Sequence, residues 1–333
     1  MKLNVGLLGG GSWGTTVASM VARNTSVMLW ARDPATVEQI NREHRNDRYL
    51  PDAVLNERVR ASSDLAEVVS EADVLVVAVP SQGFRAVLEQ VKPHLRAWVP
   101  VISLSKGLEL DTRMRMTEII QQVLPGHPVG VLTGPNLARE IMAGQAAASV
   151  IAMEDQIIVQ QLQALFSSGL FRVYTNDDVV GCELGGVLKN IIAIAVGMGD
   201  GQGAGDNTRS ALITRGLAEV TRLGVALGGR PETFAGLAGM GDMIATCTSP
   251  QSRNRHVGIE LGKGRHIDDV LAEMVMVAEG VKSAPAVMAL AEQHGISMPI
   301  ARDVYQVVSG ERTASQAYRG LLRVQPGAES EPG

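Results

Sequence analysis

The segment Val5-Gly6-Leu7-Leu8-Gly9-Gly10-Gly11-Ser12-Trp13-Gly14 decides the fold of the amino-terminal half of this chain. Its first four residues are an apolar run that predicts a buried strand, and the stretch Thr15 to Arg23 after it is helical. The glycines between them fit the pattern G-x-G-x-x-G. Gly9 allows a tight turn, Gly11 lets a pyrophosphate approach the backbone, and Gly14 lets the helix pack closely on the sheet. The segment therefore predicts a dinucleotide site whose phosphates face the amides of a helix N-terminus.

Strand and helix signals alternate up to about residue 180. Strands are predicted at Val27–Trp30, Ala72–Val79, Val99–Leu104 and Val129–Thr133, with late strands at Ala146–Met153 and Phe171–Thr175 that extend the same sheet. Apolar runs spaced by helices are typical of a buried parallel sheet, and the initial βαβ order predicts a right-handed doubly wound unit.

Helical patterns alone continue beyond residue 180. They cover Glu183–Gly197, Thr208–Gly224, Pro231–Gly236, Ile267–Val275, Ser283–Gly295 and Pro299–Ser309. The sequence thus predicts an α/β protein in two domains. Residues 1–180 form a Rossmann-type doubly wound parallel sheet that binds NAD(P), residues 181–323 form an all-helical substrate and catalytic domain, and residues 324–333 form a disordered tail.

Composition restricts the partners of the chain. Its 333 residues carry a net charge of −5 with 3% aromatic residues, which argues against a nucleic-acid partner. No apolar run reaches the roughly 18 residues of a membrane span, and the N-terminus has no signal-peptide architecture. Cys182 and Cys247 have no metal-type spacing and are predicted to be reduced core thiols in a cytoplasmic protein. The scattered histidines predict no metal site.

Lys189 lies in the small and apolar stretch Gly185–Val196, where a helix would be buried on most sides. Burial disfavours the charged form of an ammonium, and a lysine with a pKa lowered toward neutrality can give or take a proton. The stretch alone leaves a second interpretation open, in which the stem lies on apolar surface and the amine reaches water.

Arg32 follows the second predicted strand, at the position where the choice of dinucleotide is made. An NAD site usually carries Asp or Glu there, whereas Arg32 can stack on adenine and pair with a 2′-phosphate. This favours NADPH over NADH and leaves dual use open. Asp33, one residue later, also suits a helix cap before Pro34.

Other polar residues follow predicted strand ends or glycine turns. Lys106 follows a strand end, at the edge that lines the ligand crevice of a doubly wound sheet, although a solvated loop lysine is the alternative. Asn136 follows another strand end and is either a ligand contact or a helix N-cap. Asp242 follows Gly241 and can pair with Lys189 to set its protonation, or cap a helix. Ser252-Arg253-Asn254 offers donors for a phosphate, or is a polar surface loop.

These motifs in this order resemble the bacterial NAD(P)-dependent glycerol-3-phosphate dehydrogenase family, from Gly6 to about Leu322. The segments that carry the resemblance are GGGSWG, LSKGLE, TGPNLAREI, LGGVLKNIIAIAVGMGDG, ALITRGLAE, GMGDMIATCTSPQSRNR and VAEGV. The resemblance implies reduction of dihydroxyacetone phosphate to sn-glycerol 3-phosphate with NADPH or NADH, which supplies glycerophospholipid synthesis. It also implies a homodimer, and a substrate bound in the crevice between the domains.

The resemblance assigns roles to individual residues. Lys189 is implied to be the proton acceptor in glycerol 3-phosphate oxidation, with Lys106 and Asp242 as the other catalytic residues. The substrate is implied to contact Lys106, Gly134, Asn136, Lys189, Asp242, Ser252, Arg253 and Asn254. The glycine motif already places Gly9, Gly11 and Gly14 at the dinucleotide. The resemblance implies that the dinucleotide also contacts Ser12, Trp13, Arg32, Lys106, Ala138, Arg253, Val277 and Glu279. Asn136 departs from the family, which often has Ser or Thr there, but a side-chain amide can still bond a substrate oxygen.

Two other functions stay open on the residues alone. A 3-hydroxyacid or 6-phosphogluconate-type dehydrogenase also joins such a domain to a helical one and uses a lysine, and its carboxylate substrate would suit Ser252-Arg253-Asn254 as well. A non-catalytic dinucleotide sensor would have no need of a buried lysine.

Overall fold

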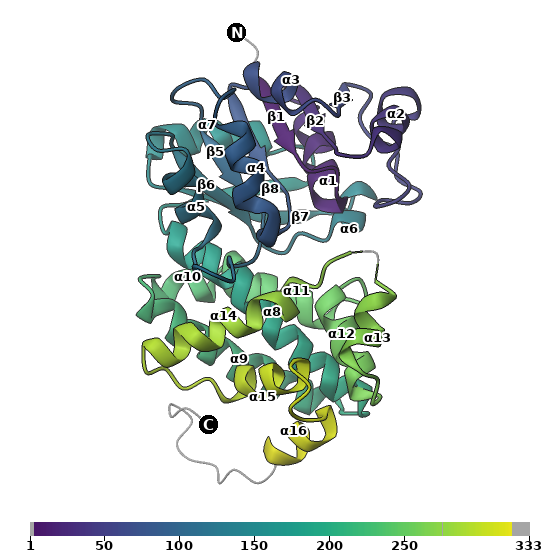
Figure 1. Ribbon diagram of the computed structural model, residues 1–333, viewed down its shortest axis with the longest axis vertical. Helices are drawn as coiled ribbons and strands as arrows, with labels where there is room; N and C mark the ends of the chain where they lie inside the picture. Colours follow the sequence, from purple (N-terminus) through teal and green to yellow (C-terminus); the bar gives the residue numbers. More distant parts are fainter. Residues whose placement is uncertain (1–2, 275, 322–333) are drawn as a thin grey trace. The chain divides into compact units, whose positions relative to one another are not determined.

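The computed structural model describes residues 3–274 and 276–321, so the tail predicted for 324–333 lies outside the described residues. The chain divides into two compact units. The first holds residues up to Ser105 and Met114–Val179, and the second holds Lys106–Arg113 and the chain from Val180 onward. The strands, purple to teal in Figure 1, all belong to the first unit. The short segment Lys106–Arg113, which the sequence analysis assigned to the sheet domain, is grouped with the helices.

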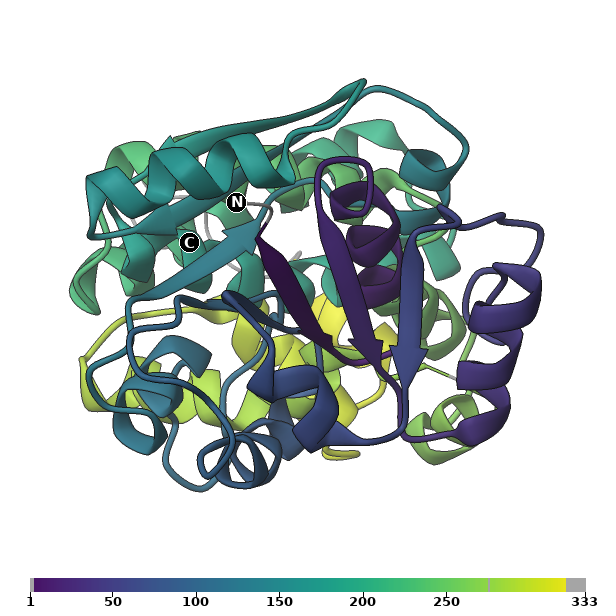
Figure 2. The same ribbon diagram turned by 90° about the horizontal axis from the view of Figure 1, so that it is seen from above.

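An eight-stranded sheet forms the centre of the first unit, in the order β3-β2-β1-β4-β5-β6-β7-β8. The strands are β1 Asn4–Leu8, β2 Ser26–Trp30, β3 Val59–Ser62, β4 Val74–Val77, β5 Val101–Ser103, β6 Val129–Thr133, β7 Ala147–Met153 and β8 Phe171–Asn176. The order of β3 to β6 is that of a doubly wound dinucleotide fold, which confirms the predicted fold class. Figure 2 shows β1, β2 and β3 side by side with their arrowheads at the same end.

Two features of the sheet differ from the sequence prediction. β7 pairs antiparallel to β6, and β8 then runs parallel to β7, so the sheet is mixed at this side. A buried antiparallel strand is as apolar as a parallel one, so its direction is invisible in the sequence. β3 was missed because it is a four-residue edge strand, Val-Arg-Ala-Ser, in which only alternate side chains are buried.

Helices cover both faces of the sheet. They are α1 Ser12–Val21, α2 Pro34–Glu43, α3 Leu65–Ser70, α4 Phe84–Val91, α5 Met116–Val123, α6 Ala138–Met142 and α7 Gln156–Phe166. Leu7 packs in one core with side chains of α1, α6 and α7, and its neighbour Leu8 packs in another with α3, α4 and α5. Successive side chains of a strand point to opposite faces, so an unbroken apolar strand needs both layers.

The second unit is helical in its described residues and is built around α8, Val179–Gly201. The other helices are α9 Asp206–Ala226, α10 Pro231–Ala235, α11 Asp242–Thr248, α12 Arg253–Gly262, α13 Ile267–Ala272, α14 Glu279–Gln293, α15 Pro299–Val308 and α16 Ala314–Leu321, with the π-helical turn η2 Leu237–Gly241 before α11. These helices run from teal to yellow in Figure 1. α8 is long and apolar enough to cross a membrane, but 89% of its most apolar window is buried inside the protein. Such burial is typical of a helix at the centre of a hydrophobic core.

Candidate active site

The glycine-rich turn joins β1 to α1 in a conformation that requires its glycines. Gly9 has φ of +120°, and a Cβ on Gly14 would lie 2.1 Å from the carbonyl oxygen of Gly9. A Cβ on Gly11 would meet nothing within 4 Å, so this side of the turn is open. Gly11 is also the N-cap of α1 and provides no side-chain cap. The first amides of α1 are thus left for an anion such as a pyrophosphate.

Asn46 holds this turn in place, and the sequence analysis missed it. Its side chain is fully buried, and Nδ2 donates to the carbonyl of Gly10 at 2.9 Å and to the hydroxyl of Thr15 at 2.8 Å. Trp13 follows the turn, and its indole nitrogen is buried with no hydrogen-bond partner among the described residues. An unpaired buried donor is costly unless a ligand satisfies it, so the turn fits a bound dinucleotide.

Arg32 lies beyond the end of β2, where its side chain is exposed and has no hydrogen bond within the described residues. Asp33 is the N-cap of α2 and accepts from the amide of Ala35 at 3.0 Å and the hydroxyl of Thr36 at 3.2 Å. The cap interpretation of Asp33 is confirmed. Arg32 is thus a side chain at this strand end that is left for a ligand.

Gly134 and Asn136 follow β6. Gly134 has φ of +133° and lies against β7, where a Cβ would be 3.2 Å from the Cα of Ser149. Asn136 donates to the hydroxyl of Ser149 at 3.1 Å, which in turn donates to the carbonyl of Thr133 at 2.7 Å. The N-cap of α6 is Leu137, so the N-cap interpretation of Asn136 is wrong. Its Oδ1 is buried and has no partner among the described residues, which leaves an acceptor for a ligand.

Lys189, Lys106 and Asp242 come together in the second unit. Lys189 is 5% exposed on α8 and donates to Oδ1 of Asp242, the first residue of α11. Lys106 donates to Oδ2 of the same carboxylate at 2.6 Å. Lys189 also donates to the hydroxyl of Thr246, one turn along α11, at 2.5 Å. One buried carboxylate thus lies between two ammonium groups.

Burial lowers the pKa of Lys189 from its ordinary value of 10.5 to about 8. The Asp242 carboxylate raises that pKa and the Lys106 ammonium lowers it, but loss of water is the largest effect. The interpretation of Lys189 as a lysine whose amine reaches water is therefore wrong. An amine with a pKa near 8 exchanges a proton readily around neutral pH.

The backbone before α11 places Asp242. The π-helical turn η2 precedes it directly, and a Cβ on Gly239 in this turn would lie 2.1 Å from the carbonyl oxygen of Phe234. Only glycine permits this close approach. Asp242 is the first residue of α11 and its carboxylate binds the two lysines, so it is not the helix cap.

Ser252, Arg253 and Asn254 form the N-terminus of α12. Ser252 is the N-cap, and its hydroxyl accepts from the amide of Arg255 at 3.2 Å. The exposed Arg253 side chain donates to the carbonyl of Val277 at 2.9 Å. The first amides of a helix of this length, together with a guanidinium, form a good phosphate site.

Asn254 is turned inward and links three elements. Its amide nitrogen donates to Oδ1 of Asn190 at 2.9 Å, and its oxygen accepts from the amide of Gly280 at 3.0 Å. Asn190 follows Lys189 on α8, and its Nδ2 approaches the carbonyl of Lys106 at 3.5 Å. Nothing in the sequence predicts Asn190, Thr246 or Asn46 as site residues, because each is an ordinary polar residue whose partner lies far away in the chain.

The other predicted residues are placed as follows. Ala138 begins α6 and packs against the core of the sheet unit, Val277 is 40% exposed, and Glu279 is the first residue of α14. Both cysteines are free and buried, and burial raises the pKa of Cys247 to about 12. Within residues 3–274 and 276–321 no group of three or more His, Cys, Asp or Glu side chains is arranged to hold a metal ion.

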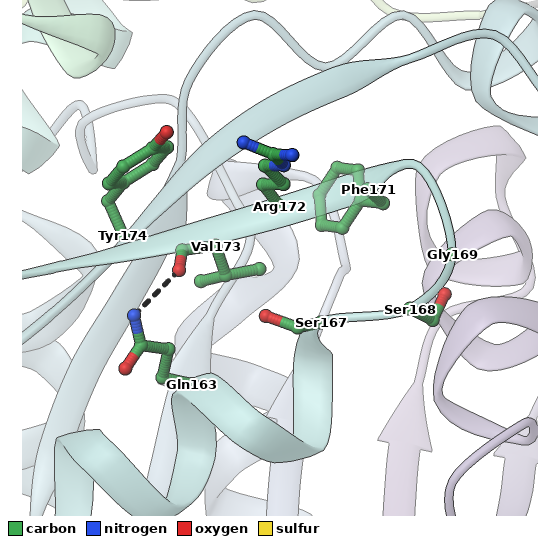
Figure 3. Close-up of a pocket in the computed structure, with 8 residues that line it drawn as sticks. All are labelled: Gln163, Ser167, Ser168, Gly169, Phe171, Arg172, Val173 and Tyr174. Carbon is green, nitrogen blue, oxygen red and sulfur yellow. Dashed lines mark hydrogen bonds between the residues drawn. The ribbon is translucent and has the colours of Figure 1, made fainter.

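A pocket at the free β8 edge of the sheet contains none of the predicted site residues. It is lined by Gln163, Ser167–Gly169 and Phe171–Tyr174. Figure 3 shows the Gln163 amide donating to the carbonyl of Val173, at 2.8 Å, beside this pocket. The titratable side chains among its lining residues are Arg172 and Tyr174, and neither was predicted to take part in the chemistry.

The two units together define a class of protein. A sheet of this order with an open glycine turn binds a dinucleotide, and the helical unit carries an amine that exchanges a proton near neutral pH. The chain is therefore of the class of dinucleotide-dependent oxidoreductases.

Comparison with known proteins identifies the family. Residues 4–159 match the model of the NAD-dependent glycerol-3-phosphate dehydrogenase N-terminus, and residues 178–319 match that of its C-terminus. The chain is 72% identical to a glycerol-3-phosphate dehydrogenase of the NAD(P)+ type from Sphingopyxis alaskensis, over the whole of both chains. It is 56% identical to one from Mycobacterium avium, over 97% of this chain and 95% of the relative.

A solved structure gives the same result. The crystal structure of glycerol-3-phosphate dehydrogenase from Coxiella burnetii is 37% identical and superposes with a TM-score of 0.93, over 97% of this chain and 99% of that one. The chain belongs to the NAD-dependent glycerol-3-phosphate dehydrogenase family. This membership decides against the 3-hydroxyacid or 6-phosphogluconate-type dehydrogenase and the non-catalytic sensor.

Proposed function

We propose that this chain reduces dihydroxyacetone phosphate to sn-glycerol 3-phosphate with NADPH or NADH, and that NADPH is favoured. The observation that supports it most directly is the buried Lys189, with a pKa near 8, bonded to an Asp242 carboxylate that also binds Lys106. Such a group supplies the proton that a carbonyl needs when it becomes a hydroxyl.

The first unit has the residues to hold the dinucleotide. The amides at the start of α1, after Gly11, would face the pyrophosphate, with Ser12 and Trp13 beside them, while Gly9 and Gly14 hold the turn in the shape that this requires. Arg32 would contact the adenosine end. Ala138, Lys106, Arg253, Val277 and Glu279 complete the proposed cofactor set. The bound nicotinamide supplies the hydride that the reduction requires.

Lys189 is the proposed proton donor when dihydroxyacetone phosphate is reduced. Its ammonium protonates the oxygen of the former carbonyl, and its neutral amine takes the proton back when glycerol 3-phosphate is oxidised. Asp242 keeps the ammonium form populated despite burial, because its charge raises the pKa of Lys189. Lys106 adds positive charge where negative charge develops on the substrate oxygen.

The substrate phosphate is proposed to bind the N-terminus of α12, through the amides there, the hydroxyl of Ser252 and the guanidinium of Arg253. Asn254, bonded to Asn190 and Gly280, fixes this end of the helix to α8, which carries Lys189. Gly134 and the free acceptor of Asn136 are proposed as the remaining substrate contacts.

The cellular setting belongs to the same proposal. The product, sn-glycerol 3-phosphate, would supply glycerophospholipid synthesis in the cytoplasm, and the enzyme would act as a homodimer. Sedimentation of the purified protein at micromolar concentration tests the dimer.

The decisive experiment is oxidation of NADPH by the purified protein with dihydroxyacetone phosphate as the only other substrate. Lys189→Ala is expected to lower turnover by roughly 100-fold or more, as loss of a general acid does, while NADPH still binds. Lys263→Ala is the matched control, because Lys263 is an exposed lysine on the same unit that pairs only with Glu260 among the described residues. No NADPH oxidation by the wild-type protein would contradict the proposal, as would normal turnover of a folded Lys189→Ala variant.

A further inference from the structure

The turn Arg45–Leu50, which follows α2, is fixed to the glycine-rich loop. Asn46 is fully buried and donates to the carbonyl of Gly10. The backbone of the turn is also bonded to Asn46, because the amide of Leu50 donates to the carbonyl of Asn46 at 2.8 Å. The Leu50 side chain is fully buried and anchors the other end of the turn. A side chain on this turn therefore has a defined position relative to the proposed dinucleotide site.

Arg48 extends from this turn to the end of β2. Its Nη1 lies 3.5 Å from Oδ2 of Asp33, and its guanidinium carbon lies 5.4 Å from the ring centre of Tyr49. The side chain is 58% exposed and makes no hydrogen bond to the residues that the structure describes. Its N–H groups are thus held near the strand end and remain available to a ligand.

The charges at this strand end favour an anion. Arg48 lies beside the carboxylate of Asp33, which follows Arg32 in the chain and whose oxygens are already engaged by the start of α2. The carboxylate of Asp47, on the same turn, is paired with Arg45. A carboxylate engaged in this way is poorly placed to accept the ribose hydroxyls of NADH. The ribose 2′ position of a dinucleotide lies at the end of this strand in folds of this order.

We propose that Arg48 binds the 2′-phosphate of NADPH together with Arg32, so that one residue of this turn sets the choice of cofactor while another, Asn46, holds the glycine loop. This inference rests on the proposed function for the presence of a dinucleotide on that loop. Guanidinium groups suit the ligand because each binds phosphate through parallel N–H bonds, and a phosphate has oxygens for two of them.

The test measures binding of 2′,5′-ADP and of 5′-AMP by calorimetry, which separates the 2′-phosphate from the rest of the ligand and needs no turnover. Arg48→Ala is expected to weaken 2′,5′-ADP by about 10-fold or more, as loss of a charge-assisted hydrogen bond does, and 5′-AMP by less than about 2-fold. Arg45→Ala is the matched control, because Arg45 lies on the same turn and pairs with Asp47. It is expected to leave both affinities unchanged.

A second readout is the ratio of the KM values for NADPH and NADH, which Arg48→Ala should raise by a similar factor without a change in kcat for NADH. Equal weakening of both nucleotides by Arg48→Ala, or no weakening of either, would overturn the inference. An intact protein that selects 2′,5′-ADP through Arg48 but does not reduce dihydroxyacetone phosphate would overturn the proposed function and leave the inference standing.

Discussion

The substitution Asp242→Asn tests the catalytic cluster most sharply. It keeps the shape of a side chain that is 2% exposed and removes the negative charge that binds both Lys189 and Lys106. The two ammonium groups are then left close together without the carboxylate that lies between them. The neutral form of Lys189 becomes the favoured one, since burial and Lys106 both lower its pKa.

The size of the effect follows from these contacts. An opposite charge in direct contact shifts a pKa by roughly 1–3 units, which would take Lys189 from about 8 to between about 5 and 7. At pH 8 the ammonium form would fall from about half of the enzyme to between about one part in ten and one part in a thousand. The proposed proton donor for dihydroxyacetone phosphate reduction is lost in the same proportion.

The assay is the pH dependence of kcat in both directions, with NADPH and NADP+. In the wild-type enzyme, reduction should decline and oxidation should rise as pH increases through about 8, because one needs the ammonium and the other the amine. In Asp242→Asn both transitions should move to lower pH, so that reduction recovers when the buffer is acidified. Asp242→Glu, which retains the charge, is the control.

Two results would refute this reasoning. A folded Asp242→Asn variant with an unshifted pH profile would show that Asp242 does not set the protonation of Lys189. A loss of activity that is equal at every pH would show that Asp242 only positions the substrate or the helix. The thermal midpoint of each variant confirms that the fold is retained.

Three further predictions concern other parts of the second unit. Arg253→Ala should impair reduction of dihydroxyacetone phosphate strongly and of unphosphorylated dihydroxyacetone little, because the substrate phosphate is proposed to bind Arg253. Equal losses in this cycle of two enzymes and two substrates would place Arg253 on the dinucleotide or in the loop. Gly258→Ala should lower the thermal midpoint and raise the KM for substrate, with a cost of about 1–3 kcal/mol, because its Cβ would lie 2.1 Å from the carbonyl oxygen of Ile194 where α12 packs on α8. Gly205→Ala, with no atom within 4 Å of its Cβ, is the control, and equal behaviour of the two variants would disprove the close packing. Glu219 is buried and accepts from the first amides of α15, and burial raises its pKa from 4.5 to about 7, so the folded state binds the proton more tightly than the unfolded state does. Its contribution to stability is fully present below about pH 4.5 and is lost as pH rises to about 7, up to about 3 kcal/mol. Chemical denaturation across this range should show a smaller pH dependence for Glu219→Gln, and an identical dependence would contradict the shift.

The sequence was sufficient for features whose causes are local. Leu7 and Leu8, side by side in an apolar run before a glycine turn, require a strand covered on both faces, and the structure has both cores. Lys189 is surrounded by apolar residues on its own helix, so burial and a lowered pKa could be offered as one of two interpretations, and the structure decides for it. Gly9 and Gly14 are required by the turn itself.

Tertiary structure alone decided which side chains meet. Asp242 reaches Lys189 across 53 positions of the chain and Lys106 across 136, and no pattern of spacing records such a distance. The direction of β7 depends on its hydrogen-bond partners rather than on its composition, which is equally apolar in either direction. Asn46 has an ordinary place in a polar turn, and only the folded backbone brings its amide to Gly10. The periodicity of apolar residues predicts which side of a helix or strand is buried. A catalytic cluster instead depends on contacts between segments that are distant in the chain.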